Sequence, residues 1–346
     1  MAKVLFVTTS FPTYAGDPSG HFVQTEARLR AMAGASVVVL APWPSARGER
    51  APTPAHAEVA RTTPRVTVHW VAGGDAFGWP GVLPRLGERP SRAAAIARFV
   101  VDARRAARRL GPFDNVVAHW LVPSAWPIAK VARGSLEVVA HGSDVKLVER
   151  LPRACRVTLA RTLLARGARF RFVSDELCER FARATLPAVR ARSRVEACAI
   201  DVNGVPSRED ARARLRVGDE RLGVVVGRLV ATKEPVHAVK LAEQHVERVV
   251  VVGDGPLADV VRRSCPRALL VGKLPRPEAL AWIAAADLLI SASREEGAAT
   301  VVREARALGT PVLAVPAGDL EAQALHDPGI TLVRDAAGGT TRENAA

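Results

Sequence analysis

Two glutamates, eight residues apart, are the strongest candidates for chemistry in this sequence. Glu296 follows an apolar, strand-like run, and Glu304 lies where the pattern predicts the first turns of a helix. A buried carboxylate is costly unless it accepts hydrogen bonds, so two of them beside a loop of small residues suit a hydroxyl-rich ligand. The peptide N–H groups of Gly297, Ala298 and Ala299 are free to meet an anion at the start of that helix. The alternative is that both acids only complement a helix dipole.

Two cations, Arg228 and Lys233, follow an earlier apolar run and precede a predicted helix. Such a pair on one loop suits a diphosphate, because guanidinium and ammonium groups neutralise phosphate oxygens. The alternative is two exposed charges among the 49 Lys and Arg residues of the chain. A position at the C-terminal edge of a sheet favours the diphosphate site. The next two apolar runs end in turns that carry Gly253 and Gly255, and then Lys273, which are candidates for the same ligand.

In the first half of the chain, Gly20 and His141 also lie at or after the ends of predicted strands. Gly20 precedes a predicted helix over 21–32, and its missing side chain lets a ligand approach the backbone amides. A merely flexible loop is the alternative. His141 ends an apolar run, and Asp144 follows three residues later. The imidazole can donate a hydrogen bond to a substrate hydroxyl or accept one, although a structural histidine is the usual case. His119, at the end of the preceding run, fits a packing role equally well.

Short, continuously apolar runs separated by helix-length segments supply the elements that position these residues. Continuous hydrophobicity indicates burial on both faces, which is typical of parallel strands covered by helices. Alternation of strands and helices predicts doubly wound α/β sheets. We predict two Rossmann-like domains, one over 1–200 and one over 201–334, with a disordered tail over 335–346. The predicted strands are Val4–Thr8, Val37–Ala41, Val66–Val71, Asn115–Trp120, Val138–His141, Phe170–Ser174, Val195–Ile200, Gly223–Gly227, Val249–Gly253, Leu269–Gly272, Leu288–Ala292, Pro311–Val315 and Ile330–Val333.

Composition narrows the class of protein further. The 346 residues carry a formal charge of +14, which favours anionic ligands such as nucleotide diphosphates, acidic lipid surfaces or nucleic acid. The four cysteines have no metal-site spacing and are expected to be small core residues of a reduced compartment. The first residues turn polar too soon for a signal peptide, and no run approaches the ~20 apolar residues of a transmembrane helix. We therefore expect a cytoplasmic protein.

The motifs, taken in order, resemble those of the family 4 glycosyltransferases, which have the GT-B fold of two Rossmann-like doubly wound domains facing a central cleft. The resemblance runs from Lys3 to about Val333, and the spacing of the two glutamates is its most specific part. Two N-terminal motifs resemble one branch of the family. The motifs that carry the resemblance are Gly227-Arg-Leu229 with Lys233, Gly253-Asp-Gly-Pro256, Glu296-Gly-x6-Glu304-Ala-x3-Gly309-Thr-Pro-Val312, Gly20-His-Phe-Val23 and His141-Gly-Ser-Asp144.

The resemblance implies a retaining transfer of a sugar from a nucleotide sugar to an envelope glycan, a lipid-linked molecule or a small molecule. It also implies that the domain over 1–200 binds the acceptor and that the domain over 201–334 binds the nucleotide sugar. Glu304 would hold the ribose hydroxyls, and Glu296 with the neighbouring amides would orient the transferred sugar. Arg228 and Lys233 would neutralise the departing diphosphate, so that neither a metal nor another cofactor is required. His141 would contact the sugar. Its backbone carbonyl would be available to a displacement in which the acceptor attacks the face of the sugar that the leaving group occupies.

Three departures from the family pattern lead to further expectations. Ala298 and Ala299 stand where the family commonly has Phe-Gly, so contacts with the sugar are expected to differ. Glu234 replaces the usual glycine after Lys233 and is expected to place a carboxylate near the diphosphate. Family members usually end with further helices that pack back on the N-terminal domain. Because this chain stops shortly after Val333, looser closure or reduced activity is expected.

The acceptor side of the sequence is strongly basic. Residues 91–110 are predicted to form a helix with an apolar stripe and many arginines, and 150–194 carry twelve more arginines. Contact with an anionic membrane surface is one interpretation, and a helix that simply covers a sheet is the alternative. Three other functions stay open, namely a sugar-nucleotide epimerase, a non-catalytic sugar-nucleotide-binding protein and a nucleic-acid-binding protein. Charge alone supports the last, and no nucleic-acid-binding motif accompanies it, so nucleic acid is not expected as a partner.

Overall fold

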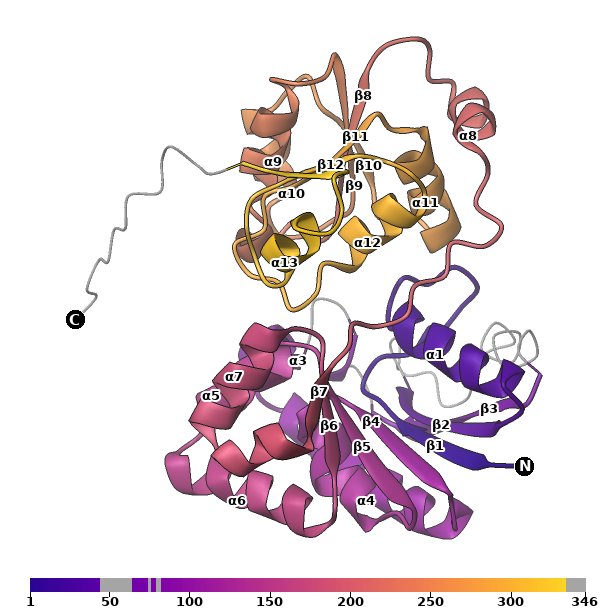
Figure 1. The fold of residues 1–346 in the computed structure, drawn as a ribbon, viewed down its shortest axis with the longest axis vertical. Coiled ribbons are helices and arrows are strands. Elements are labelled where there is room, and N and C mark those ends of the chain that lie inside the picture. Colours follow the sequence, from indigo (N-terminus) through magenta and orange to yellow (C-terminus); the bar gives the residue numbers. More distant parts are fainter. Residues whose placement is uncertain (44–63, 74–75, 79–81, 334–346) are drawn as a thin grey trace. The chain divides into compact units, whose positions relative to one another are not determined.

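The computed structural model describes residues 1–43, 64–73, 76–78 and 82–333. The chain divides into two compact units, Met1–Asp201 and Val202–Ala346. The division falls within one residue of the boundary expected from the sequence. The predicted tail over 335–346 lies outside the described residues. Each unit is an α/β domain with a wholly parallel sheet, and its helices lie on both faces of that sheet (Figure 1). This confirms the predicted fold class of paired doubly wound domains.

The N-terminal unit contains a seven-stranded sheet with the order β3-β2-β1-β4-β5-β6-β7. The order reverses between β1 and β4, which pair directly with Val4 opposite Asn115. Its strands are β1 (Lys3–Val7), β2 (Ser36–Trp43), β3 (Val66–Ala72), β4 (Asn115–His119), β5 (Ser135–Ala140), β6 (Arg169–Phe172) and β7 (Ser193–Val195). Its helical segments are α1 (His21–Met32), α3 (Val82–Glu88), α4 (Arg92–Leu110), η2 (Leu121–Ile128), η3 (Ala129–Val131), α5 (Ser143–Glu149), α6 (Arg153–Ala165), α7 (Asp175–Ala184) and η4 (Pro187–Arg192).

The C-terminal unit contains a six-stranded sheet with the order β10-β9-β8-β11-β12-β13. Here the order reverses between β8 and β11, with Leu289 opposite Val224. Its strands are β8 (Leu222–Val226), β9 (Arg248–Val252), β10 (Leu269–Gly272), β11 (Leu288–Ser291), β12 (Val312–Ala314) and β13 (Ile330–Leu332). Its helical segments are α8 (Arg208–Leu215), η5 (Ala231–Lys233), α9 (Pro235–Ala242), α10 (Ala258–Ser264), α11 (Arg276–Ala285), α12 (Thr300–Ala307) and α13 (Leu320–Ala324).

Continuous apolar strands explain why both faces of each sheet are covered. In the C-terminal unit, Val224 and Val250 belong to one buried cluster, and Val225 and Val251 belong to another. Successive side chains of a strand point to opposite faces, so each run of valines supplies two hydrophobic layers at once. Helices must then cover both layers. This arrangement leaves the carboxyl ends of the strands as the edge where polar side chains gather.

The basic helix expected over 91–110 is α4, and it covers the N-terminal sheet. Phe99, Ala103 and Ala107 of its apolar stripe are buried, and Phe99 packs edge-on against Phe77 with ring centroids 4.7 Å apart. The helix contacts β2, β3, η2 and η3. Because the apolar stripe of α4 packs on the sheet, no membrane is needed to explain it. The exposed arginines occupy the remaining surface of the helix.

Two expectations from the sequence are wrong in detail. The last strand of the N-terminal sheet ends at Val195 instead of continuing to Ile200, because this edge strand is mostly exposed and pairs with β6 over only three residues. The cysteines are not all core residues. Cys178 and Cys265 are buried, Cys198 is half-buried, and Cys155 is exposed on α6.

Candidate functional site

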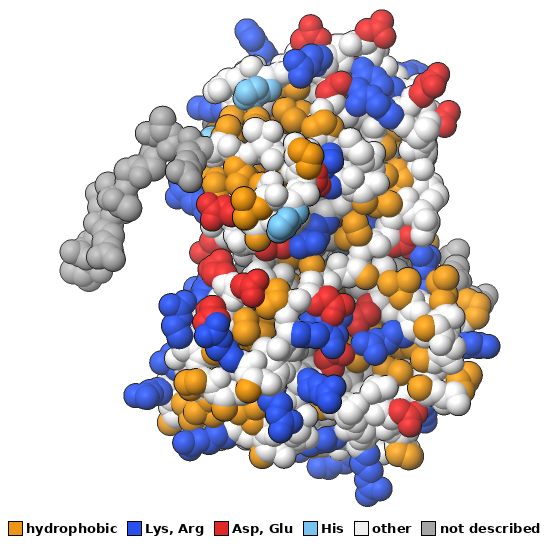
Figure 2. Space-filling model, in the orientation of Figure 1, with side chains coloured by type: hydrophobic (Ala, Val, Ile, Leu, Met, Phe, Trp, Pro, Cys, Tyr) orange, Lys and Arg blue, Asp and Glu red, His pale blue; other side chains and the backbone are white. Residues whose placement is uncertain are grey.

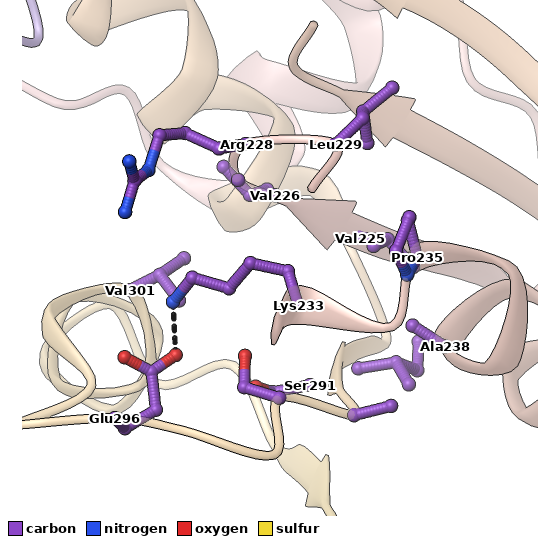
Figure 3. A pocket seen from close by; sticks show the side chains of 14 residues that line it. Val225, Val226, Arg228, Leu229, Lys233, Pro235, Ala238, Ser291, Glu296 and Val301 are labelled. Atoms are coloured by element: carbon purple, nitrogen blue, oxygen red, sulfur yellow. Dashed lines mark hydrogen bonds and ion pairs between the residues drawn. The ribbon is translucent and has the colours of Figure 1, made fainter. Parts of the chain in front are cut away.

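A pocket lies beyond the carboxyl ends of β8 and β11, where the strand order of the C-terminal sheet reverses. Ligands of open α/β sheets bind at this kind of position, because the loops from the two adjacent strands leave in opposite directions. The pocket is lined by Val225, Val226, Gly227, Arg228, Leu229, Lys233, Pro235, Ala238, Ile290, Ser291, Ala292, Ser293, Glu296 and Val301 (Figure 3). Three of the four residues predicted to be catalytic are therefore in one pocket.

Lys233 and Glu296 form an ion pair in this pocket. The Nζ of Lys233 donates to Oε1 of Glu296, and the two side chains point toward each other (Figure 3). Their side chains are only 25% and 10% exposed, so the attraction between them is less screened than that of a surface pair. The single turn η5 places Lys233, and the loop between β11 and α12 places Glu296. The ammonium group therefore has a carboxylate partner at the position where a diphosphate was predicted.

Arg228 lines the same pocket from the turn after β8, and its residue is exposed. Glu234 is the N-cap residue of α9 and has left-handed backbone angles, with φ 45° and ψ 51°. Its Oε1 lies 3.0 Å from Nε of Arg294. The left-handed conformation favours glycine, which explains why glycine is usual at this position in the family that the sequence resembles. The carboxylate of Glu234 pairs with Arg294.

Gly253 and Gly255 have a steric reason to be glycine. Both have positive φ angles, and a Cβ on Gly253 would lie 1.8 Å from the carbonyl oxygen of Gly227. The N–H of Gly227 donates to Val252 (2.9 Å), and the N–H of Gly253 donates to Gly272 (2.8 Å). These bonds tie together the turns after β8, β9 and β10. Neither glycine lines the pocket, nor does the exposed Lys273.

Glu304 is buried in α12, and its carboxylate has a partner that the sequence did not suggest. Nη2 of Arg276, the first residue of α11, lies 2.6 Å from Oε1 of Glu304. The two side chains are 17% and 9% exposed. A buried carboxylate is stable when a cation compensates it, so the pair explains how α12 carries an acid inside the fold. Glu304 does not line the pocket that holds Glu296.

The loop of small residues leads into α12. Gly297 and Ala298 are half-buried, while Ala299 is buried and is the N-cap residue of the helix. No side chain among the described residues caps this end, so its first N–H groups lack an intrahelical partner. The backbone of Gly318 approaches this loop closely, since a Cβ there would lie 2.8 Å from the carbonyl oxygen of Glu296. The loop is therefore held from both sides.

In the N-terminal unit, Gly20 is the N-cap residue of α1 and has left-handed backbone angles. A Cβ at this position would lie 2.3 Å from the carbonyl oxygen of Ser10, in the loop that follows β1. The glycine thus allows that loop to fold against the start of α1. This steric role explains the residue independently of any ligand.

The imidazole of His141 is engaged on both nitrogens. Its Nε2 lies 3.1 Å from Nδ1 of His119, and its Nδ1 lies 3.6 Å from Sγ of Cys198. Asp144 is buried, and its Oδ1 accepts hydrogen bonds from the backbone N–H groups of His141 (3.0 Å) and Gly142 (2.9 Å). Burial raises the pKa of Asp144, although these backbone donors oppose the rise. The histidine is therefore fixed in place through both its ring and its peptide group.

Charged residues that the sequence did not single out lie behind this histidine. Arg171 on β6 and Glu26 on α1 are buried, and Nη2 of Arg171 lies 2.5 Å from Oε2 of Glu26. Burial, together with the charges of Arg171 and Arg30, holds the pKa of His119 well below its ordinary value. Burial, His119 and Arg171 lower the pKa of His141 in the same way. Both imidazoles are therefore neutral at pH 7.

The described residues contain neither a candidate metal site nor a candidate membrane-spanning helix. The part of the chain that the structure describes contains no group of three or more His, Cys, Asp or Glu side chains that could hold a metal ion. Within the same residues, no helix combines the length and the apolar character needed to cross a membrane. The predicted independence of metals and cofactors stays a prediction.

Comparison with known proteins shows which family the C-terminal unit matches. Residues 220–338, which include the whole pocket, match the sequence model of the family described as Glycosyl transferases group 1. The chain is also 26% identical over 332 residues to a Bacillus subtilis protein named as the teichuronic acid biosynthesis glycosyltransferase TuaC. That alignment spans 91% of this chain and 81% of the relative. The C-terminal unit therefore matches the group 1 glycosyltransferase family, and the chain is similar to a glycosyltransferase along most of its length.

Solved structures show the same fold for this glycosyltransferase. Sucrose-phosphate synthase from Thermosynechococcus elongatus superposes with a TM-score of 0.72 at 17% identity, over 96% of this chain and 86% of that one. Anabaena HepE, solved in complex with UDP-glucose, superposes with a TM-score of 0.64 at 18% identity, over 96% and 86%. These likenesses place the two parallel-sheet domains in the GT-B class.

Proposed function

We propose that this glycosyltransferase moves a sugar, with retention of anomeric configuration and without a metal ion, from a nucleotide sugar to an acceptor hydroxyl. The observation that carries the proposal is the pocket at the β8/β11 switch point, which brings Arg228, Lys233 and Glu296 together. Two cations and a carboxylate at this edge suit a ligand with a diphosphate at one end and a sugar at the other. The complex of Anabaena HepE with UDP-glucose supports a nucleotide sugar as the donor.

The chemistry needs one bond to form and one to break at the anomeric carbon. The acceptor oxygen forms the new glycosidic bond, the bond to the β-phosphate breaks, and the nucleoside diphosphate leaves with the electron pair. The proton of the acceptor hydroxyl passes to the departing phosphate. Negative charge therefore grows on the diphosphate in the transition state, where fixed cations lower the barrier most. Arg228 and Lys233 supply those cations.

The remaining roles follow from the family resemblance and from the contacts. Glu296 orients the transferred sugar together with the amides of Gly297 to Ala299. Glu304 holds the ribose hydroxyls, and Arg276 orients its carboxylate through the contact at 2.6 Å. His141 offers its peptide group to the sugar, since both ring nitrogens already have protein partners.

The acceptor is a glycan, a lipid-linked molecule or a small molecule, and the protein works in the cytoplasm, peripherally on the inner face of a membrane. The +14 charge supports the membrane contact. On the face in Figure 2, Lys and Arg side chains spread over the N-terminal unit without forming a single patch. We expect binding to vesicles that strengthens with anionic lipid and weakens with salt. Vesicle binding that changes with neither anionic lipid content nor salt would contradict the proposed membrane contact.

Thermal denaturation with UDP-, GDP- and ADP-sugars tests the donor site. A true donor present at 100 times its Kd should stabilise the protein by about 2.7 kcal/mol. The effect should disappear in Glu304→Ala and persist in the control Glu321→Ala, which removes an exposed glutamate of α13. Equal stabilisation of all three proteins would exclude Glu304 from the site.

Product analysis with the same donor tests the transfer itself. Proton NMR of the product should show the anomeric configuration of the donor, and EDTA should leave the rate unchanged. Inverted product, or a rate that EDTA abolishes and a divalent cation restores, would contradict the proposed mechanism.

A further inference from the structure

A chain of polar side chains runs from the interior of the N-terminal unit to the carboxyl end of β5. It begins at Glu26 on α1, passes through His119 at the end of β4 and His141 after β5, and ends at Cys198 after β7. The separations are 3.7 Å from Glu26 Oε2 to His119 Nε2, 3.1 Å between the imidazoles and 3.6 Å from His141 to the sulfur. We refer to these four residues as the Glu26–Cys198 chain.

The charge of Glu26 determines which ring nitrogens carry the protons along the Glu26–Cys198 chain. A neutral imidazole carries one proton, and the Nε2 of His119 faces a carboxylate, so the favourable tautomer has the proton on that nitrogen. The Nδ1 of His119 is then an acceptor, and the Nε2–H of His141 donates to it. The Nδ1 of His141 is left as an acceptor for the thiol hydrogen of Cys198. At 3.7 Å the contact of His119 with Glu26 is electrostatic and not a hydrogen bond, and Nε2 of His119 has no hydrogen-bond partner among the described residues. This assignment directs its N–H toward the carboxylate and gives the other two contacts a donor and an acceptor.

Ion pairs around Glu26 hold its carboxylate in place. Arg171 approaches Glu26 at 2.5 Å and lies 3.4 Å from Glu137 on β5. Arg30, one turn along α1, lies 3.1 Å from Glu26. The end of the network near β7 contains Glu196, at 3.7 Å from Arg171. Buried charges with several partners are expensive to rearrange, so the carboxylate facing His119 is a fixed feature of the fold.

The ring of His141 is also enclosed from the sides. The centroids of Trp120 and Phe22 lie 4.8 Å and 4.9 Å from it, and His119 stacks on it at 5.3 Å with an interplanar angle of 16°. Trp120 has φ 74°, an unusual backbone angle for a bulky residue. Strained residues of this kind cluster at functional sites, where the surrounding structure holds them. The packing fixes the ring plane, and the Glu26–Cys198 chain fixes which nitrogen carries the proton.

We propose that Glu26, His119 and Cys198 are positioning residues that lock His141 in its neutral Nε2–H tautomer and thereby hold its peptide group for sugar transfer. The proposal rests on the proposed function, in which that peptide group faces the sugar. The three residues act through His141 and need no contact with donor or acceptor. Outer partners of this type change the rate by about 10- to 100-fold in metal sites, where they orient histidine ligands in the same manner.

Nitrogen-15 NMR of the histidine rings tests the lock independently of activity. In the full-length protein at pH 7, both His119 and His141 should show a protonated Nε2 and an unprotonated Nδ1. Glu26→Gln should shift His119 toward the other tautomer, because the carboxylate no longer favours the proton on Nε2. A protonated Nδ1 on His141 in the unaltered protein would overturn the proposal whether or not any sugar is transferred.

Paired cysteine variants test the positioning role. Cys198→Val replaces the thiol donor with a somewhat larger apolar side chain, and we expect kcat to fall about 10-fold while the donor KM changes less than twofold. Cys198→Ser retains a hydroxyl donor and should recover most of the rate. The control Cys155→Val alters an exposed cysteine of α6 and should be neutral.

The outcomes separate the two proposals. If the unaltered protein transfers no sugar from any donor, the proposed function fails, and the NMR result still decides the tautomer lock. If transfer is observed and Cys198→Val keeps the full rate, the positioning role is refuted. A loss of rate in Cys198→Val that Cys198→Ser does not recover would also refute it, because packing alone would then explain the loss.

Discussion

Replacing Asp144 with asparagine removes a buried acceptor at the start of α5. The carboxylate accepts three backbone hydrogen bonds, from Leu121 at 2.9 Å and from His141 and Gly142 at 3.0 Å and 2.9 Å. An asparagine has nearly the same shape but only one accepting oxygen. Whichever way its amide turns, an NH₂ group must face at least one of these N–H donors.

The magnitude follows from the bonds that are lost. A buried donor left unsatisfied costs about 1–3 kcal/mol, and the amide that faces it adds a repulsive contact. Burial raises the pKa of Asp144, so the variant also gains by removing a buried charge. We expect the free energy of unfolding of the N-terminal unit to fall by about 2 kcal/mol. For a unit of this size that corresponds to a drop in Tm of about 4–8 °C.

Urea denaturation followed by fluorescence measures the difference, and its pH dependence checks the cause. The raised pKa means that ionisation of Asp144 destabilises the native state, so the unaltered protein regains this free energy as the pH falls through the native pKa toward 3.8. The variant has no titrating group there. The difference between the free energies of unfolding of the unaltered protein and of Asp144→Asn should therefore grow from pH 7 toward pH 4.

A matched change at Asp102 on the exposed side of α4 provides the control. Among the described residues Asp102 pairs with neighbours on its own helix, Arg98 at 3.7 Å and Arg105 at 3.4 Å, so Asp102→Asn should change stability by less than about 0.5 kcal/mol. If Asp144→Asn were equally neutral, or if that difference shrank on acidification, the account of a buried carboxylate held by three backbone donors would be refuted.

Four further changes have expected outcomes. Lys233→Met should lower kcat by about 10²–10³, measured with saturating nucleotide sugar, because the leaving diphosphate loses a fixed cation. Glu234→Gly should stabilise the C-terminal unit by about 1 kcal/mol in urea, since glycine adopts the left-handed angles without strain and the lost partner is an exposed arginine. Phe99→Ala, in the fully buried stripe of α4, should cost about 3–5 kcal/mol by the same assay. Gly253→Ala places a Cβ 1.8 Å from a carbonyl oxygen and should destabilise the C-terminal unit by about 3 kcal/mol, again measured in urea.

The apolar runs in the sequence located the strands of both sheets apart from the edge strand β7, because parallel strands buried on two faces leave a signal that needs no knowledge of their partners. The same reasoning placed Arg228, Lys233 and Glu296 in one pocket. All three follow the carboxyl ends of β8 and β11, and parallel strands bring those ends to one edge. The prediction failed at Ile200, where the edge strand β7 stops early.

Contacts that depend on the order of the strands could not be predicted from the sequence. Arg276 meets Glu304 because α11 and α12 pack together, and nothing in the local sequence of either helix indicates it. Cys198 reaches His141 across 57 residues only because the segment after β7 returns to the end of β5. Arg171 left one signal that was overlooked, an arginine between two phenylalanines inside the predicted strand Phe170–Ser174.

The Lys233–Glu296 pair has a consequence for the end of each catalytic cycle. An ammonium group that already has a carboxylate beside it does not depend on the diphosphate for a counter-ion. Under the proposed function, the carboxylate would replace the departing nucleoside diphosphate beside Lys233, so that this half-buried ammonium group keeps a counter-ion. We therefore expect Glu296 to lower the affinity for the spent nucleotide and to limit inhibition by the product.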